Sequence, residues 1–458
     1  MINWYLKFLL IYSLILLLNP INAEILNNKV PTPKKVPVTF EAHGVTRVDN
    51  YYWMRDDTRE DEEVISHLES ENKYIESWFD SGEDLRDKLF EEITDRIPKK
   101  EDSVPVRLKS YEYFRRYEPG NEYGIYIRRK NKNAKEFVLI DVNELAKDSE
   151  FYQLANWSIS PKEDLMAYAE DTTGRREYNI KFKNLNTGQT YKNGLSNSSG
   201  DMAWSSDGRY LFYVLRDQET LLPFKLFRHE IGSSQSEDVL VYEEKDPTFY
   251  LSVGNSRSMQ FIEINISSTT SSEVRLINSD SPEEPPYIFL KRESDHLYSI
   301  EHDPEDNRFL IETNWLAKNF RLMAIDLKKS EDKNEWDELI PHREDVLLQS
   351  ALAFPNHLVV MERENGLRHL KIITKKDNTE RSINFNDPAY SAYLAANPEY
   401  YSDKFYFGYS SLRTPDSLFS SKLLTGRKRL LKQAEVKGPF SKSDYKVERK
   451  FIEGRDGT

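Results

Sequence analysis

After residue 104, apolar and polar residues alternate along most of the chain in short segments that occur in pairs. A period of two is typical of a β-strand with one buried face, and two such segments separated by a turn indicate a hairpin. The seven pairs are 111–114 with 123–127, 165–169 with 178–182, 210–214 with 224–227, 259–262 with 274–277, 308–311 with 320–323, 357–361 with 369–373 and 404–407 with 417–420.

The first segments of these pairs follow one another at a mean spacing of about 49 residues, which is within the range of propeller blades. Several are preceded by turn-forming residues, as at 160–164, 205–209 and 303–307. One strand pair cannot bury both of its faces, whereas seven four-stranded units in a ring cover one another. Two stacked β-sandwiches are the alternative, but they do not predict so even a period. The pattern therefore predicts an all-β, seven-bladed β-propeller over residues 104–440.

The preceding residues 24–103 follow a different pattern and predict a short N-terminal arm, extended over residues 24–55 and α-helical after them. Residues 24–55 contain spaced prolines, and Thr58 is a candidate N-cap for a helix whose first turn is acidic. A break at 81–82 separates it from a second helix, which ends before Pro98. The apolar positions that recur at helical spacing, and that need something to cover them, are Val64, Ile65, Leu68, Ile75, Trp78, Phe79, Leu85, Leu89, Phe90 and Ile93.

The first 23 residues have the pattern of a secretory signal peptide. Lys7 precedes an apolar run at 8–18, which is shorter than the ~20 residues that span a bilayer. Asn19 and Pro20 end the run, and Ala23 offers a small residue at the cleavage point. We therefore expect an exported protein, periplasmic or secreted, with no membrane association after cleavage. An uncleaved anchor is the alternative.

Composition removes several classes of function. The net charge is −13, so nothing suggests the basic surface of a nucleic-acid-binding protein. The chain has no cysteine, which excludes disulfides, thiolate nucleophiles and cysteine metal sites. Aromatic residues reach 12%, which favours β-structure. Serine, threonine, histidine and carboxylates remain as possible reactive groups.

Motifs for chemistry are absent from the sequence. It has no phosphate-binding loop, no H-E-x-x-H and no G-x-S-x-G nucleophile elbow. Ser196 and Ser256 lie in two segments that resemble the nucleophile elbow but lack its second glycine. Both segments lie between the predicted strands of the repeats. His296 and His302 are six residues apart, which favours structural roles over a metal pair. The residues by themselves predict no catalytic, cofactor-binding or metal-binding site.

Several longer segments resemble the prolyl oligopeptidase family, and among its groups oligopeptidase B, also called protease II. The resemblance runs from about residue 31 to the end of the chain, and its motifs stand in the family's order. They are GVTRVDNYYWMRDD at 44–57, YAEDTTGRR at 168–176, TLLP at 220–223, VYEEKDPTFY at 241–250, TSSEVR at 270–275, NFNDPAY at 384–390 and GYSS at 408–411.

The resemblance implies a seven-bladed propeller that caps an α/β-hydrolase domain. Members of the family are serine peptidases, and this group cleaves short peptides after Arg or Lys without a cofactor. Their catalytic serine, aspartate and histidine lie in the hydrolase domain, so they would lie beyond Thr458. Residues 441–458 resemble the first strand of that domain, which is otherwise absent from the chain.

The resemblance therefore implies the N-terminal and propeller region of an oligopeptidase B-like serine endopeptidase, in which the propeller restricts substrate size. Short basic peptides would be substrates of the complete enzyme, and the helical arm would pack on the missing hydrolase domain. The chain alone is expected to be inactive. The alternative is a stand-alone, non-catalytic propeller that binds peptides or proteins; the apolar helices argue against it because such a module would avoid an exposed patch.

One charged cluster is a candidate for contacts between the two domains. Glu170, Asp171, Arg175 and Arg176 stand together at the end of a predicted strand pair. A charged loop between strands, with no partner domain, explains the same residues equally well.

Overall fold

The computed structural model describes residues 30–80 and 82–458, and it divides into two compact units between Ile97 and Pro98. The predicted signal peptide, 1–23, lies outside the described residues. Within the described part, no helix combines the length and the apolar character that crossing a membrane requires.

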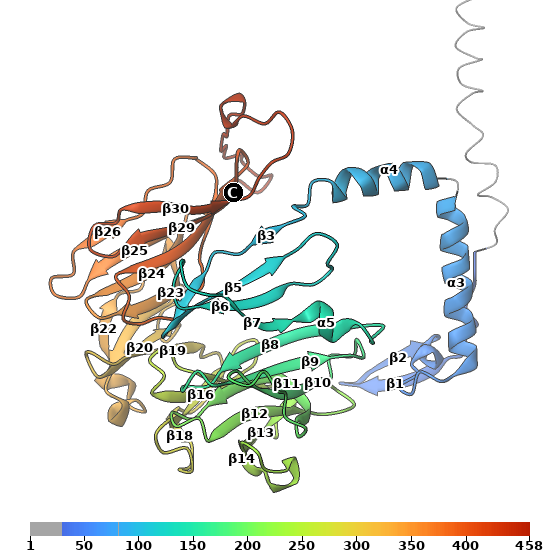
Figure 1. The fold of residues 1–458 in the computed structure, drawn as a ribbon, viewed down its shortest axis with the longest axis horizontal. Helices are drawn as coiled ribbons and strands as arrows, with labels where there is room; N and C mark the ends of the chain where they lie inside the picture. The colour runs from blue at the N-terminus through green and yellow to red at the C-terminus, as the bar shows by residue number, and fades with distance from the viewer. Residues whose placement is uncertain (1–29, 81) are drawn as a thin grey trace, which may run out of the picture. The chain divides into compact units, whose positions relative to one another are not determined.

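The first unit contains a hairpin and two helices (Figure 1). Asp61 caps the longer helix, since its carboxylate accepts the N–H groups of Glu63 at 2.9 Å and Val64 at 3.2 Å. The predicted cap, Thr58, is wrong: its hydroxyl donates to Asp56 at 2.7 Å, before the helix begins. The elements are β1 (Val38–Ala42), β2 (Val45–Asp49), η1 (Tyr52–Met54), α3 (Glu62–Asp80) and α4 (Glu83–Thr94).

The apolar stripes predicted on these helices are present and, within the first unit itself, mostly uncovered. Val64 is buried, whereas Leu68 of α3 is 56% exposed and Phe90 of α4 is 67% exposed. Helical propensity and capping alone give such helices little stability, because most helical stability in proteins comes from packing of the apolar face.

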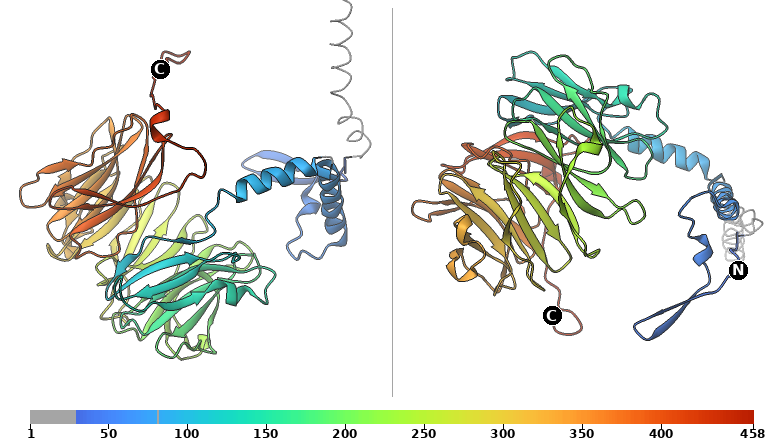
Figure 2. Two further views of the ribbon diagram at one scale, coloured as in Figure 1. Left: turned by 45° about the horizontal axis from the view of Figure 1, so that its top comes forward. Right: turned by 90° about the horizontal axis from the view of Figure 1, so that it is seen from below.

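The second unit contains six antiparallel sheets that follow one another along the chain around a common axis (Figures 1 and 2). The first holds β3 (Glu101–Asp102), β4 (Val106–Leu108), β5 (Tyr111–Tyr117), β6 (Ile125–Arg129) and β7 (Phe137–Asp141), and is followed by α5 (Val142–Ala146). The second holds β8 (Gln153–Ile159), β9 (Leu165–Asp171), β10 (Tyr178–Asn184), β11 (Leu195–Trp204), β12 (Tyr210–Arg216), β13 (Pro223–Glu230) and β14 (Val239–Glu243), with η2 (Gln235–Glu237).

The remaining four sheets have four strands each. The third holds β15 (Tyr250–Asn255), β16 (Phe261–Ser267), β17 (Ser272–Asn278) and β18 (Tyr287–Leu290). The fourth holds β19 (Tyr298–Asp303), β20 (Arg308–Thr313), β21 (Arg321–Ile325) and β22 (Asp337–Ile340), with η3 (Leu327–Lys329) and η4 (Lys333–Glu335). The fifth holds β23 (Val346–Phe354), β24 (His357–Glu364), β25 (Leu367–Thr374) and β26 (Glu380–Ser382). The sixth holds β27 (Ser391–Leu394), β28 (Lys404–Ser411), β29 (Thr414–Lys422) and β30 (Lys428–Gln433), and η5 (Lys442–Asp444) follows it.

All seven strand pairs expected from the sequence are hydrogen-bonded antiparallel neighbours. The expectation of seven separate sheets requires a correction, because the second and third pairs share one seven-stranded sheet. Strand β11 causes the merger. It pairs with β10 at Leu195 and Ser198, and with β12 from Ser198 to Trp204, so one long strand reaches both neighbours.

Both faces of a typical sheet are buried against its neighbours. On β20, Phe309 and Ile311 belong to a cluster shared with the third sheet, while Leu310 points into a cluster shared with the fifth. Successive residues of a strand point to opposite faces, which explains this division. Six such clusters hold the unit together, including one between the two halves of the second sheet.

Among the described residues, no buried apolar cluster joins the sixth sheet to the first. No strand is shared between these two sheets either. We call the region where they face each other the seam. Because apolar burial is the main stabilising term in folding, the seam is the weakest junction of the unit.

Candidate functional site

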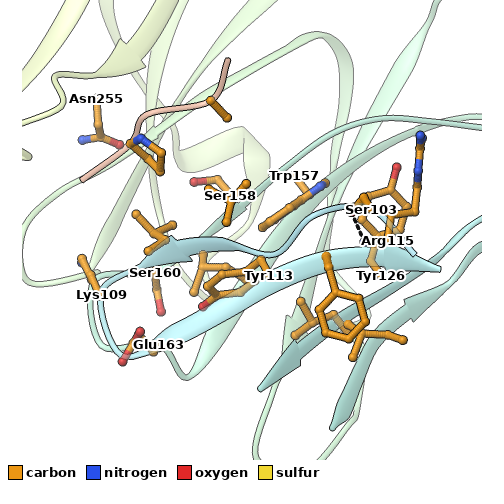
Figure 3. Close-up of a pocket in the computed structure, with 18 of the residues that line it drawn as sticks. Ser103, Lys109, Tyr113, Arg115, Tyr126, Trp157, Ser158, Ser160, Glu163 and Asn255 are labelled. Atoms are coloured by element: carbon orange, nitrogen blue, oxygen red, sulfur yellow. Dashed lines mark hydrogen bonds between the residues drawn. The ribbon is translucent and has the colours of Figure 1, made fainter. Parts of the chain in front are cut away.

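The second unit contains a cavity of about 550 Å³, lined mainly by residues of its first and second sheets (Figure 3). Its walls are largely aromatic: the ring of Trp157 lies 5.7 Å from that of Tyr113 and 6.1 Å from that of Tyr126. These rings come from β8, β5 and β6, so the first and second sheets build this wall together. The polar and charged residues that line the cavity are Ser103, Lys109, Arg115, Ser158, Ser160, Glu163 and Asn255.

Lys109 and Glu163 lie in the turns that connect β4 to β5 and β8 to β9. The backbone N–H of Ser110 donates to the Glu163 carboxylate at 3.0 Å, and Lys109 Nζ donates to the carbonyl of Pro161 at 3.3 Å. Burial lowers the pKa of Lys109, although the charges of Glu163 and Glu399 oppose the shift. These contacts fix the polar end of the cavity.

The cavity is suited to binding rather than to covalent catalysis. Its lining residues include serines but no histidine, and a serine needs an adjacent base to become a nucleophile. A serine–histidine contact does exist elsewhere, with His302 Nδ1 2.8 Å from Ser258 Oγ. Burial lowers the pKa of His302 to about 4, and its ring packs on Phe261 and Phe309. His296 is also buried, so both histidines are core residues.

Neither of the two segments that resemble a nucleophile elbow, around Ser196 and Ser256, lies between a strand and a helix. The Ser196 hydroxyl, on β11, donates to Gln235 at 3.1 Å. The Ser256 hydroxyl lies in the turn after β15, 2.9 Å from that of Ser258. Both hydroxyls serve local packing.

A loop over residues 395–403, between β27 and β28, forms part of the same cavity. Ala396 and Pro398 line it, although they come from the sixth sheet. We call this segment the crossing loop. The sequence analysis missed it, because its contacts lie up to 290 residues away in the chain. Only the dipeptide Asn397–Pro398 marks it locally, as a turn signal.

The seam is polar where the first and sixth sheets face each other. A second cavity of about 410 Å³ lies there, between Arg107 and Glu112 on one side and Asp403 and Lys404 on the other. Lys432 Nζ also reaches across, to the Glu101 carboxylate at 2.6 Å. Such partly exposed ion pairs contribute about 0–1 kcal/mol each, which is less than a buried apolar cluster contributes.

The structure brings the four predicted interdomain residues together in one hairpin but gives them different surroundings. Asp171 is fully buried, and its carboxylate accepts the N–H groups of Thr173, Gly174 and Arg176. Burial raises its pKa, but these hydrogen bonds lower it by more, so the net pKa lies below the usual value.

The other three residues face outward to different degrees. Glu170 is half-buried and accepts the hydroxyl of Tyr152 at 2.7 Å, while Arg175 and Arg176 are exposed. The backbone carbonyl of Arg176 accepts a hydrogen bond from Arg216 at 2.7 Å. Asp171 therefore shapes the hairpin, and the two arginines are the members that a partner domain could reach.

Replacing Asp171 with alanine is expected to lower the free energy of unfolding by about 2 kcal/mol, because several backbone donors lose a charged acceptor. Urea denaturation measures this change. The matched control is Arg175→Ala in the same exposed hairpin, which should change it by less than about 0.5 kcal/mol. Equal effects of the two substitutions would contradict the assigned role of Asp171.

Across residues 30–80 and 82–458, no three metal-ligating side chains gather into a group. The arrangement therefore offers a ring-shaped unit with an internal binding cavity and one weak seam.

Comparison with known proteins gives a consistent family. The family described as "Prolyl oligopeptidase, N-terminal beta-propeller domain" matches residues 30–434. Dipeptidyl aminopeptidase BI of Pseudoxanthomonas mexicana is 36% identical over 471 residues, covering 98% of this chain and 64% of that protein. Protease 2 of Moraxella lacunata is 33% identical over 437 residues, covering 94% of this chain and 62% of that protein.

Among solved structures, oligopeptidase B from Leishmania major superposes with a TM-score of 0.88 at 30% identity, covering 94% of this chain and 64% of that one. The chain thus spans less than two thirds of the length of these relatives.

Proposed function

Because the chain belongs to the prolyl oligopeptidase family, we propose that it is the N-terminal and propeller region of an oligopeptidase B-like serine endopeptidase. The complete enzyme would hydrolyse short peptides after Arg or Lys. The observation that carries the proposal is the match of the family's propeller domain to residues 30–434, in a chain that covers 64% of its 36%-identical relative.

We place the catalytic serine, aspartate and histidine in the part of the relatives that this chain does not span. The absence of a serine–histidine pair from the described cavity supports that placement. We also propose that part as the packing partner of the apolar stripes of α3 and α4, since exposed patches of this kind mark interaction sites. Arg175 and Arg176 stay candidates for contacts with it.

The propeller would act as a substrate-size filter with seven blades. The buried cluster between β9–β10 and β11–β12 supports counting the seven-stranded sheet as two blades, because residues pack face to face only where a sheet bends back on its neighbour. A ring with one polar seam and an internal cavity of about 550 Å³ supports exclusion of folded proteins.

A dipeptidyl aminopeptidase is the second candidate, favoured by the activity for which the 36%-identical relative is named. The two activities differ in their need for a free substrate amino terminus. An endopeptidase cleaves an acetylated peptide after an internal Arg or Lys, whereas a dipeptidyl aminopeptidase releases dipeptides from unblocked peptides alone.

The test compares the 458-residue chain with the same chain extended by whatever the gene encodes after codon 458. Both receive acetylated and free peptides with internal Arg or Lys, with and without a serine-reactive inhibitor. We expect inhibitor-sensitive cleavage after Arg or Lys from the extended chain and none from the 458-residue chain. Inhibitor-sensitive turnover by the pure 458-residue chain would place the active site within it and overturn the proposal.

We also propose export, on the pattern of residues 1–23. Amino-terminal sequencing of the protein from its producing cells is expected to begin after Ala23. A protein that keeps its first residues and sediments with membranes would support the anchored alternative.

A further inference from the structure

We propose that the crossing loop closes one end of the ring's central space, and that Arg257 is the residue that holds it closed. This end is where turns join the first strand of a sheet to the second. The consequence for substrate entry rests on the proposed function, because only a peptidase would use the ring as a filter. The closure itself is a property of this chain alone.

Arg257 joins four sheets at one point. It lies in the turn between β15 and β16 of the third sheet, and its guanidinium pairs with Glu301 of the fourth. Nη1 donates to the carbonyl of Ala353 in the fifth sheet at 3.0 Å, and Nε donates to the carbonyl of Asn397 in the crossing loop at 2.8 Å. One guanidinium can contact all of these groups only where the inner ends of the sheets converge. The central space is therefore narrow here.

The crossing loop continues from this point to the first sheet. The Glu399 carboxylate accepts the backbone N–H of Lys109, and the Glu399 carbonyl lies 3.5 Å from Arg257 Nη2. Lys109 in turn contacts the second sheet through the carbonyl of Pro161. The loop, which belongs to the sixth sheet, thus contacts turns of both the third sheet and the first, and its contact with Lys109 crosses the seam.

The loop is also fixed at its centre and at its base. Tyr400 is 3% exposed, and its hydroxyl donates to Asp303 at 2.6 Å. The Asp303 carboxylate also accepts Lys375 Nζ at 2.6 Å. The Asn397 side chain accepts the N–H of Tyr406 at 2.7 Å and donates to its carbonyl at 2.9 Å, which imitates one more strand pairing.

The position of the loop makes it a wall. Ala396 and Pro398 line the internal cavity, while Pro398, Glu399 and Tyr401 line the cavity at the seam. Pro398 lines both cavities, so the loop stands between the two spaces. A peptide in the internal cavity would have to enter from the opposite end of the ring or through the seam, not past this loop.

The experiment measures hydrogen exchange across the 458-residue chain. In Arg257→Ala, backbone amides of residues 395–403 are expected to exchange at least about tenfold faster, because the loop loses its central donors. The matched control is Arg209→Ala, which removes an exposed arginine paired with Glu230 at 3.0 Å and should leave the loop unchanged. Unchanged exchange at 395–403 in Arg257→Ala would overturn the closure.

A milder variant covers the case in which Arg257→Ala fails to fold. Tyr400→Phe removes one buried hydroxyl without leaving a cavity, and it should accelerate exchange of the same residues by about threefold. Acceleration that is uniform over the second unit, or absent from residues 395–403, would also overturn the proposal.

A second experiment measures peptide cleavage and uses the chain extended beyond residue 458, as in the peptidase test. Arg257→Ala should raise the ratio of kcat/KM for long over short peptides by about tenfold, with the short-peptide value retained, since the substitution changes no residue of the proposed catalytic part. An unchanged ratio would overturn the role of the loop in size selection. If the extended chain cleaves nothing, the proposed function fails, while the exchange measurement still decides the closure.

Discussion

Replacing Asp387 with alanine is expected to lower the free energy of unfolding by about 4 kcal/mol, because it removes a buried carboxylate that a half-buried arginine and several hydroxyls share as their acceptor. The Asp387 side chain has no exposed surface. Its carboxylate accepts Arg413 Nε at 2.6 Å, the hydroxyls of Tyr409 and Ser411 at 2.7 Å, and that of Thr414 at 3.1 Å. These bonds tie the segment before β27 to the turn between β28 and β29.

The pH dependence of this effect follows from the pKa of Asp387. Burial raises it, but hydrogen bonds from Ser411, Tyr409, Arg413 and Thr414 lower it by more, so the folded pKa lies far below the usual value. The stabilisation is therefore complete above the unfolded pKa of about 3.9 and is lost as pH falls below it.

Urea denaturation at pH 7 and at pH 3 measures the loss of stability in Asp387→Ala and its dependence on pH. The difference between the original chain and Asp387→Ala should be largest at pH 7. The control is Asp280→Ala at an exposed position, with an expected change below about 0.5 kcal/mol. If Asp387→Ala lowers the free energy of unfolding by less than about 1 kcal/mol, the surrounding donors find other acceptors and the prediction is wrong.

Replacing Glu263 with glutamine is expected to stabilise the protein by about 4 kcal/mol at pH 9 and by about 1 kcal/mol at pH 5. Glu263 lies on β16 between Gly254 and Leu276 of the neighbouring strands. Burial, followed by the charge of Glu301, raises its pKa to about 8. The folded state therefore keeps a proton that the unfolded state releases.

The sign of the effect follows from that difference. Below about pH 4.3, a glutamate is protonated in both states and costs nothing. Between this pH and about 8, the unfolded state is increasingly favoured, and the loss of stability levels off once the folded glutamate also ionises. Glutamine keeps the shape of the side chain without the ionisation, so its advantage should grow over the same range.

Chemical denaturation from pH 5 to pH 9 checks this prediction. The matched control is Glu331→Gln at an exposed position, which should shift the midpoint little at any pH. If the advantage of Glu263→Gln does not grow with pH, the glutamate is solvated or paired in the folded protein, and the raised pKa is wrong.

Local patterns determined the elements of this protein. The strands of the predicted pairs are short segments rich in apolar residues, some of them alternating with polar ones, and the two members of a pair are neighbours in the chain, so the segment pattern and the spacing sufficed to find all seven. The interruption between the two helices was equally local, since Gly82 stands directly before α4.

Where two local signals compete, the sequence decided less. Thr58 and Asp61 are both good N-cap residues, and the structure uses Asp61 because Asp56 already binds the Thr58 hydroxyl. Likewise, the charges of Glu170, Asp171, Arg175 and Arg176 are adjacent in sequence, but burial divides them into one turn-forming carboxylate and an exposed pair of arginines.

The sequence by itself determined the period of the strands, the helical arm and, through resemblance, the family. The tertiary structure alone decided the merged second sheet, the internal cavity, the seam and the crossing loop. The physical reason is distance along the chain: Arg257 and Glu399 are 142 residues apart, and Tyr400 and Asp303 are 97 apart. Contacts of that range depend on how a ring of sheets closes, and no local pattern of residues contains that information.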